Sequence, residues 1–286
     1  VDNVSMVEKF EDPKEPAESG EHDYNGSNLD LVWQWNHNPN NLYWSLTDRD
    51  GWLRLTTGNK STSILNARNT LTQRTYGPTC AGSIKMDISN MKSGDVAGLA
   101  AFSYNYGYIA VKKENAGAKL VMVDASGNEA AKEDKPTIKA SVDCTENIVY
   151  LKEEFNFAGN QDGSDKDTVS FYYSFDGKEW KKLGEAVKLS YELTHFMGSK
   201  FAIFNYATKT TGGYVDYDYF RVSDQITGTE QPTAAWKANL EATPEVSGVV
   251  GSECEVKLKL DELTAANHSG IKASLSIPNN MRVEDV

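Results

Sequence analysis

Short stretches of alternating apolar and polar residues, separated by glycine and other turn residues, follow one another along most of the chain. Residues 83–88 read Ser-Ile-Lys-Met-Asp-Ile, the period of two expected of a strand with one buried face. Residues 96–102 are almost entirely apolar, which is typical of a central strand. No stretch of ten or more residues keeps the spacing of an amphipathic helix. Further strand patterns lie at 52–55, 108–113, 119–123, 148–152, 168–175, 178–183, 200–206 and 214–222.

Many short strands with turn residues between them predict an all-β fold, an antiparallel sandwich of two sheets. The clearest local signal is Asp176-Gly177 between two strand patterns. Glycine tolerates the positive φ that a tight hairpin turn requires, so we expect a β-hairpin over residues 168–183.

A polar, proline-containing stretch interrupts this pattern near residues 227–238 and predicts a linker. The sandwich is therefore assigned to residues 1–226. Strand patterns return at 253–260 and 271–277, but residues 239–286 are too few to complete a second sandwich. We expect this segment to be a truncated immunoglobulin-like or cohesin-like module, and the chain to be a piece of a longer protein.

The composition narrows the classes of partner. The chain carries 29 Lys and Arg against 41 Asp and Glu, a formal net charge of -12. Nucleic acid and anionic membrane surfaces both select basic proteins, so neither is an expected partner. No apolar run approaches the roughly 20 residues of a membrane-spanning helix. The 14 Tyr, 10 Phe and 6 Trp instead favour an uncharged ligand that can stack on aromatic rings.

Cysteine and histidine give no metal or redox motif. Cys80, Cys144 and Cys254 lie far apart and form no CxxC pair, although one disulfide stays open as an alternative. The four histidines show no metal-binding spacing, and each is interpreted as a surface or structural residue unless its neighbours indicate more.

Such neighbours surround His37. The segment Trp33-Gln34-Trp35-Asn36-His37-Asn38-Pro39-Asn40-Asn41 combines aromatic rings with amides, and Trp44 follows. Alternation places Trp33 and Trp35 on one sheet face. They are either a core pair or a platform for sugar rings, with the amides and His37 bonding to hydroxyl groups.

Two further segments allow the same two interpretations. Arg68, Gln73 and Arg74 lie in a strand-like stretch and either edge a sheet or point into a cleft. Residues 104–108, Tyr-Asn-Tyr-Gly-Tyr, form either an exposed binding tip or a cross-strand tyrosine ladder.

Acidic residues suggest a cation site near the end of the predicted sandwich. Asp216 and Asp218 share one strand face and are either calcium ligands or surface acids. The acidic loop at 162–167 departs from the EF-hand pattern and is a weak candidate. No nucleophile elbow, zinc-protease, phosphate-loop or dinucleotide motif occurs, and no acid pair lies in a recognisable glycosidase setting.

Several segments together resemble the C-terminal β-sandwich of glycoside hydrolase family 43 β-xylosidases and arabinofuranosidases. The resemblance covers roughly residues 5 to 225 and is carried by residues 31–55, 67–80, 97–102, 106–113, 204–208 and 213–220. It implies a concanavalin A-like jelly roll that follows a catalytic propeller absent from this chain. It also implies a structural calcium, with Glu8, Asp218 and a carbonyl near Asp30 as ligands.

These observations predict a non-catalytic carbohydrate-binding module for xylan or xylo-oligosaccharides, including arabinoxylan. We expect it to belong to a secreted bacterial hemicellulase with an N-terminal catalytic domain. The expected cleft on the concave sheet is lined by Trp33, Trp35, His37, Asn38, Arg68, Gln73, Arg74, Tyr106 and Asn205. The alternatives are a structural domain that braces the propeller and shapes its active site, and an independent glycosidase.

Overall fold

A computed structural model describes residues 6–9, 21–23, 29–127, 134–159, 166–190, 197–224, 226–227, 239–242 and 258–261. The chain divides into two compact units. The first spans Val4–Thr229, and the second comprises Val1–Asn3 with Glu230–Val286.

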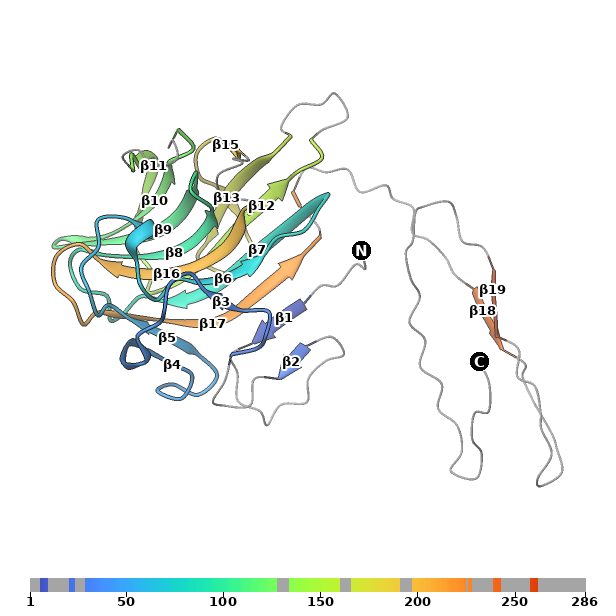
Figure 1. The fold of residues 1–286 in the computed structure, drawn as a ribbon, viewed down its shortest axis with the longest axis horizontal. Coiled ribbons are helices and arrows are strands. Elements are labelled where there is room, and N and C mark those ends of the chain that lie inside the picture. Colours follow the sequence, from blue (N-terminus) through green and yellow to red (C-terminus); the bar gives the residue numbers. More distant parts are fainter. Residues whose placement is uncertain are drawn as a thin grey trace, which may run out of the picture. The chain divides into compact units, whose positions relative to one another are not determined.

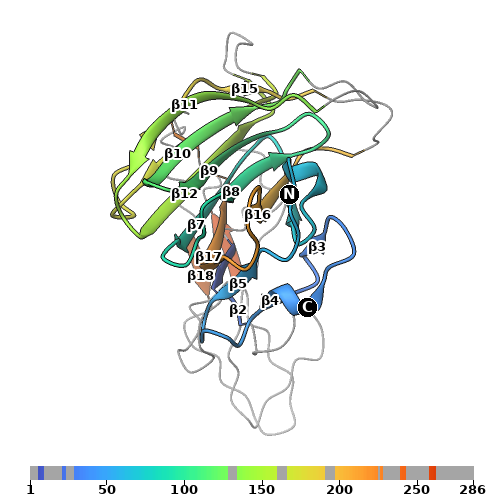
Figure 2. The ribbon, with the colours of Figure 1, turned by 90° about the vertical axis from the view of Figure 1, so that its left-hand side faces the viewer.

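The first unit consists of two sheets, drawn as two layers in Figures 1 and 2. The ten-stranded sheet has the order β14-β13-β12-β7-β17-β1-β2, with β15 beside β13, β5 beside β17 and β4 beside β5. Its strands are β1 (Met6–Lys9), β2 (Glu21–Asp23), β4 (Trp44–Ser45), β5 (Leu53–Thr56), β7 (Thr79–Asp87), β12 (Ile148–Asn156), β13 (Thr168–Ser174), β14 (Lys181–Lys182), β15 (Val187–Lys188) and β17 (Tyr214–Ser223).

The second sheet has seven strands in the order β11-β10-β9-β8-β16-β6-β3. They are β3 (Gln34–Trp35), β6 (Leu71–Arg74), β8 (Asp95–Phe102), β9 (Gly107–Glu114), β10 (Gly117–Asp124), β11 (Thr137–Cys144) and β16 (Lys200–Ala207). Apart from the parallel pair β1–β2, the strands of both sheets pair antiparallel. The predicted two-sheet sandwich is confirmed.

The pattern of β8 explains how the seven-stranded sheet is buried on both faces. Every residue of this strand is buried. One face of the strand, with Ala97, Leu99 and Ala101, belongs to the core shared with the other sheet. The opposite face, with Val96, Ala100 and Phe102, belongs to a second apolar cluster. At Gly98 a Cβ atom would lie 2.2 Å from the carbonyl oxygen of Ile109, so only glycine permits this close approach of β8 and β9.

The second apolar cluster contains four aromatic side chains in a continuous row on the face of the seven-stranded sheet that carries Ala100. Tyr106 stacks on Tyr108, which meets Phe204 edge-on, and Phe204 stacks on Tyr206. All four are buried, and Ile64 of the short 3-10 helix η2 (Ile64–Asn66) belongs to the same cluster. The centre of this face is therefore filled by the chain's own side chains rather than open to a ligand.

The predicted hairpin forms, with a longer connection than a two-residue turn. Strand β13 pairs with β14 through Tyr172 and Lys182, so the predicted second strand is reduced to two residues. Gly177 has the expected positive φ of 72°. The carboxylate of Asp176 accepts hydrogen bonds from the amides of Lys178 and Glu179, which holds those residues in the loop.

The described residues of the second unit form one antiparallel pair, β18 (Asn239–Ala242) with β19 (Leu258–Asp261). Most of the strand predicted at 253–260, and all of that at 271–277, lies outside the described residues. The identity of this segment as an immunoglobulin-like or cohesin-like module stays a prediction, as do the proposed domain limits.

Two smaller findings complete the fold. Within the described part of the chain, no helix is long and apolar enough to cross a membrane. Cys80 and Cys144 are free, buried thiols, and burial raises the pKa of Cys80 to about 12. Cys254 lies outside the described residues.

Candidate functional site

A polar pocket opens beside the end of β16, where the neighbouring strand β6 stops. β6 pairs with β16 only at residues 200–203, so the edge at residues 204–207 is left to loops. The pocket has about 330 Å³ of empty volume, which includes space open to solvent. Its lining is Asn40, Tyr43, Thr56, Gly58, Asn59, Ser61, Asn66, Ala67, Arg68, Asn69, Asn205 and Tyr206.

Asn205 lines this pocket from β16 and is only 6% exposed. Its Nδ2 donates a hydrogen bond to the carbonyl oxygen of Leu55, 2.8 Å away, which fixes the amide to the opposite sheet. Its Oδ1 is buried and has no hydrogen-bond partner. Because buried polar atoms are nearly always paired, a water or a ligand hydroxyl is the expected partner of this oxygen.

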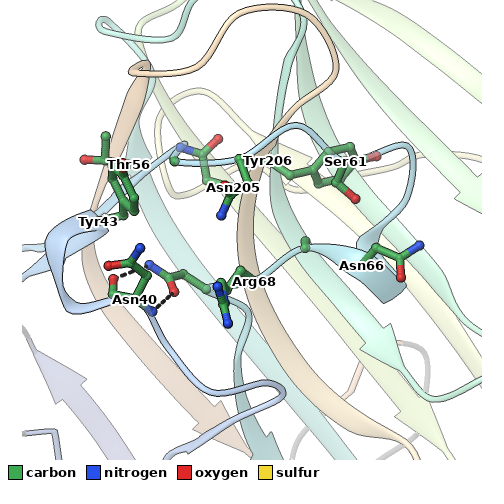
Figure 3. Close-up of a pocket in the computed structure, with 12 residues that line it drawn as sticks. Asn40, Tyr43, Thr56, Ser61, Asn66, Arg68, Asn205 and Tyr206 are labelled. Carbon is green, nitrogen blue, oxygen red and sulfur yellow. Dashed lines mark hydrogen bonds between the residues drawn. The ribbon is translucent and has the colours of Figure 1, made fainter.

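Asn40 and Asn69 hold two of the surrounding loops together (Figure 3). The amide of Asn40 donates to Asn69 Oδ1 at 2.9 Å, and Asn69 Nδ2 donates to the Asn40 carbonyl at 3.1 Å. The side chain of Asn40 also accepts a bond from the amide of Leu42, which caps the 3-10 helix η1 (Asn41–Tyr43). Hydrogen bonds within the protein thus hold this part of the pocket wall together without a ligand.

Tyr43 follows on the same helix and lies directly over Gly58. A Cβ atom at Gly58 would be 2.2–2.6 Å from three carbons of the Tyr43 ring. Glycine is therefore required for the ring to take this position in the wall.

The structure brings four of the sequence-predicted residues to the pocket or its border. Arg68 and Asn205 line it. Arg68 Nε donates to the carbonyl oxygen of Asn38 at 3.1 Å, and His37 Nε2 donates to the carbonyl oxygen of Leu65 at 2.8 Å. The exposed residues His37 and Asn38 thus tether the segment that carries Arg68.

The aromatic predictions need correction. Trp33 is 7% exposed and meets Phe220 edge-on in the main core, with ring centroids 5.1 Å apart. Tyr106 is fully buried and its hydroxyl donates to Asp134. Both rings fill cores, so neither presents a face to a ligand. Trp35 is half-buried, with its centroid 5.2 Å from that of Trp44.

Two residues of β6 also lie away from the pocket lining. Gln73 is 6% exposed, and its Oε1 has no hydrogen-bond partner. Arg74 is exposed and pairs in register with Lys200. Neither residue lines the pocket that Arg68 lines, and their assignment to a ligand site stays a prediction.

Asp216 belongs to a separate polar region on the ten-stranded sheet. Its carboxylate receives two hydrogen bonds from Arg54, at 2.7 and 2.9 Å, and a third from Arg49 at 3.2 Å. The bond to Asp216 raises the pKa of the Arg54 guanidinium. These arginines also stack on aromatic rings, Arg49 on Trp52 and Arg54 on Tyr214.

The neighbouring Asp218 is paired with the ammonium group of Lys85. That ammonium occupies a place beside the carboxylate that a calcium ion would need. The described residues contain no group of three or more His, Cys, Asp or Glu side chains that could hold a metal. The side chain of Glu8 lies outside what the structure describes, and Asp30 belongs to no such group. Calcium binding by Glu8, Asp218 and a carbonyl near Asp30 stays a prediction.

Several lining residues were not predicted as site residues, among them Asn40, Tyr43, Asn66 and Tyr206. The density of amides in segments 36–41 and 66–69 was a usable signal for the asparagines. No sequence signal identifies Tyr43, because the position of its ring depends on Gly58, which lies in the separate connection after β5.

Comparison with known families identifies this sandwich. The family model described as the β-xylosidase C-terminal concanavalin A-like domain of GH43 matches residues 21–223. The chain belongs to this family. The match also gives the two-sheet sandwich its name, a concanavalin A-like fold.

Solved structures and a curated relative agree with the GH43 C-terminal domain. The bifunctional GH43-CE protein of Bacteroides eggerthii is 47% identical with a TM-score of 0.63, over 70% of this chain and 24% of that one. A GH43 glycoside hydrolase engineered for endo-xylanase and exo-arabinofuranosidase activity is 29% identical with a TM-score of 0.63, over 71% and 40%. The β-xylosidase of Formosa agariphila is 28% identical over 69% of this chain, which spans only 34% of that enzyme's length.

Proposed function

We propose that this chain is a non-catalytic accessory module that binds xylan or xylo-oligosaccharides at the pocket beside Asn205. The observation that carries the proposal is the unpartnered Oδ1 of Asn205 in an amide-rich lining. Amides and tyrosine hydroxyls both donate and accept hydrogen bonds, which suits the hydroxyl groups of a neutral sugar.

The lining also supports a non-catalytic role. Glycoside hydrolysis requires two carboxyl groups on either side of the scissile bond. Of the described residues that line the pocket, none is Asp or Glu. We infer that hydrolysis is carried out by an N-terminal catalytic domain, and that the parent is a secreted bacterial enzyme, since its polymeric substrate lies outside the cell.

Isothermal titration calorimetry with xylohexaose tests this proposal. The exposed Asn66 lines the pocket, and Asn66→Ala should weaken binding about three- to tenfold, the effect of losing one net hydrogen bond. Asn147→Ala is the matched control, because Asn147 is also exposed and lies outside the lining. Absence of binding by the unsubstituted chain would overturn the proposal.

A second candidate function, bracing the catalytic domain, has its own observation. Leu31 is 100% exposed, Leu42 84% and Val32 36%, and all three fall within a short segment that also carries Asn40. Exposed large apolar residues gathered in one segment are typical of a docking surface.

The bracing function is tested in a protein that joins this chain to its catalytic domain. Leu31→Asp/Leu42→Asp should lower xylosidase activity and the unfolding temperature of the joined protein. Ile138→Asp/Met197→Asp is the control, because these residues are exposed elsewhere, at 51% and 48%. Equal behaviour of the two double variants would contradict docking through the segment at 31–42.

A further inference from the structure

The charge of the pocket differs from that of the chain as a whole. The chain has a formal net charge of -12, yet the described lining contains no carboxylate. Arg68 is the one charged side chain among these lining residues. A lone guanidinium in a carboxylate-free pocket favours an anionic group on the ligand.

Arg68 is held in place from one side only. Its Nε donates to the Asn38 carbonyl, which leaves the terminal Nη atoms without a hydrogen bond to the described residues. The next residue, Asn69, is buried and bonded twice to Asn40, so the backbone beside Arg68 is anchored. In the view of Figure 3, Arg68 lies between Asn40 and Asn66, across from Asn205.

Three other arginines of the sandwich are already engaged, and Arg74 is exposed outside the pocket lining. Arg49 and Arg54 bind the carboxylate of Asp216, and Arg221 stacks on Tyr219 with a centroid distance of 4.0 Å. Arg68 combines a fixed Nε with free terminal nitrogens at a pocket. This is the arrangement that receives a carboxylate through a fork of two parallel hydrogen bonds.

The size of the pocket limits what can enter it. Only about 20 Å³ admits the centre of a water-sized group, which is room for roughly one such group. A xylan backbone therefore lies across the mouth of the pocket, and a single polar group, such as the tip of a branch, enters it.

We propose that Arg68 makes this pocket a site for the carboxylate of a uronic acid branch on xylan. The inference rests on the proposed function, the binding of xylan at the same pocket, and adds the class of branch that is preferred. The carboxylate would bind the Nη atoms of Arg68. Hydroxyl groups of the branch would form hydrogen bonds with the side chains of Asn66 and Asn205.

Calorimetry with three ligands tests the proposal: a neutral xylo-oligosaccharide, the same oligosaccharide carrying one glucuronic acid branch, and its carboxyl-reduced form. The acidic ligand should bind about tenfold more tightly than the reduced one, the effect of one charge-assisted bond. Added salt should shrink this difference, because the guanidinium is exposed.

Arg68→Gln should remove the preference for the acidic ligand, so that the variant binds the acidic and the carboxyl-reduced ligands with equal affinity. Arg74→Gln, the matched control with the same change of charge outside the lining, should keep the preference. Equal affinity for the acidic and reduced ligands overturns the uronic acid proposal and leaves xylan binding intact. A preference that persists in Arg68→Gln overturns the assignment to Arg68, and no binding of any ligand overturns both proposals.

Discussion

Two polar regions of the same sandwich differ in how far their polar groups are satisfied. Around Asp216 and Asp218, every carboxylate has an arginine or lysine partner, and the arginines stack on Trp52 and Tyr214. In the pocket beside β16, a buried amide oxygen of Asn205 has no partner, and Arg68 pairs with no carboxylate of the described residues.

This difference separates stability from binding. A saturated network gains little from a ligand, because a ligand must first displace existing bonds. An unsaturated pocket recovers a desolvation cost when a ligand supplies the missing partner. We therefore expect substitutions in the Asp216 region to change the free energy of unfolding, and substitutions in the pocket to change affinity.

The largest expected effect is that of Asp216→Ala. Asp216 is 3% exposed in its side chain, and its removal leaves Arg54 and Arg49 without their shared partner, at a cost of about 3 kcal/mol of unfolding free energy. Urea denaturation measures the change, while the affinity for xylohexaose should stay the same. The exposed pair Asp143–Lys119 gives the control, since Asp143→Ala should cost less than about 1 kcal/mol. Equal losses in both variants would remove the distinction.

Glu153 gives a third case, because its side chain is fully buried, has no hydrogen-bond partner and does not line the pocket. Both of its carboxylate oxygens lack hydrogen bonds, and burial raises its pKa well above the usual range. Above the ordinary glutamate pKa, Glu153 therefore stays protonated in the native state and is deprotonated in the unfolded chain. Wild-type stability should therefore fall as the pH rises above the ordinary glutamate pKa of about 4.3 toward the raised native value.

Glu153→Leu should remove that decline and raise the unfolding free energy at pH 7 by about 1–3 kcal/mol. Urea titrations of both proteins at pH 5 and pH 8 measure it. A decline of the same steepness in the variant would show that Glu153 is not its source.

Gly58→Ala tests the pocket wall with a single methyl group. The new Cβ would overlap the Tyr43 ring, so the ring must move and the affinity for xylohexaose should drop about threefold or more. Gly127→Ala is the matched control, because nothing lies within 4 Å of its added Cβ. Unchanged affinity in Gly58→Ala would mean that Tyr43 does not shape the binding surface.

The sequence predicted those features that depend on local pattern. Strands β7 and β8 were predicted because alternation and continuous apolarity are properties of a single strand. The exposed strand β11 was missed, since five of its eight residues are exposed and the pattern is weak.

The site depended on contacts between distant segments. Alternation cannot say which face of a sheet is covered, and so Trp33 and Tyr106 were assigned to a ligand although each fills a core. The partners of Asp216 also come from far away, since Arg54 lies 162 positions earlier in the chain. Arg68 and Asn205 were predicted because arginine and amide clusters are visible in the sequence, but their meeting at one pocket was not.

Proton–nitrogen correlation NMR during a xylohexaose titration locates the ligand on the sandwich. If xylohexaose binds at the pocket, the side-chain amide signals of Asn40, Asn66 and Asn205 shift as the ligand is added, while the Trp52 indole signal stays in place. Shifts confined to Trp52 and its neighbours, with the pocket asparagines unchanged, would contradict the account.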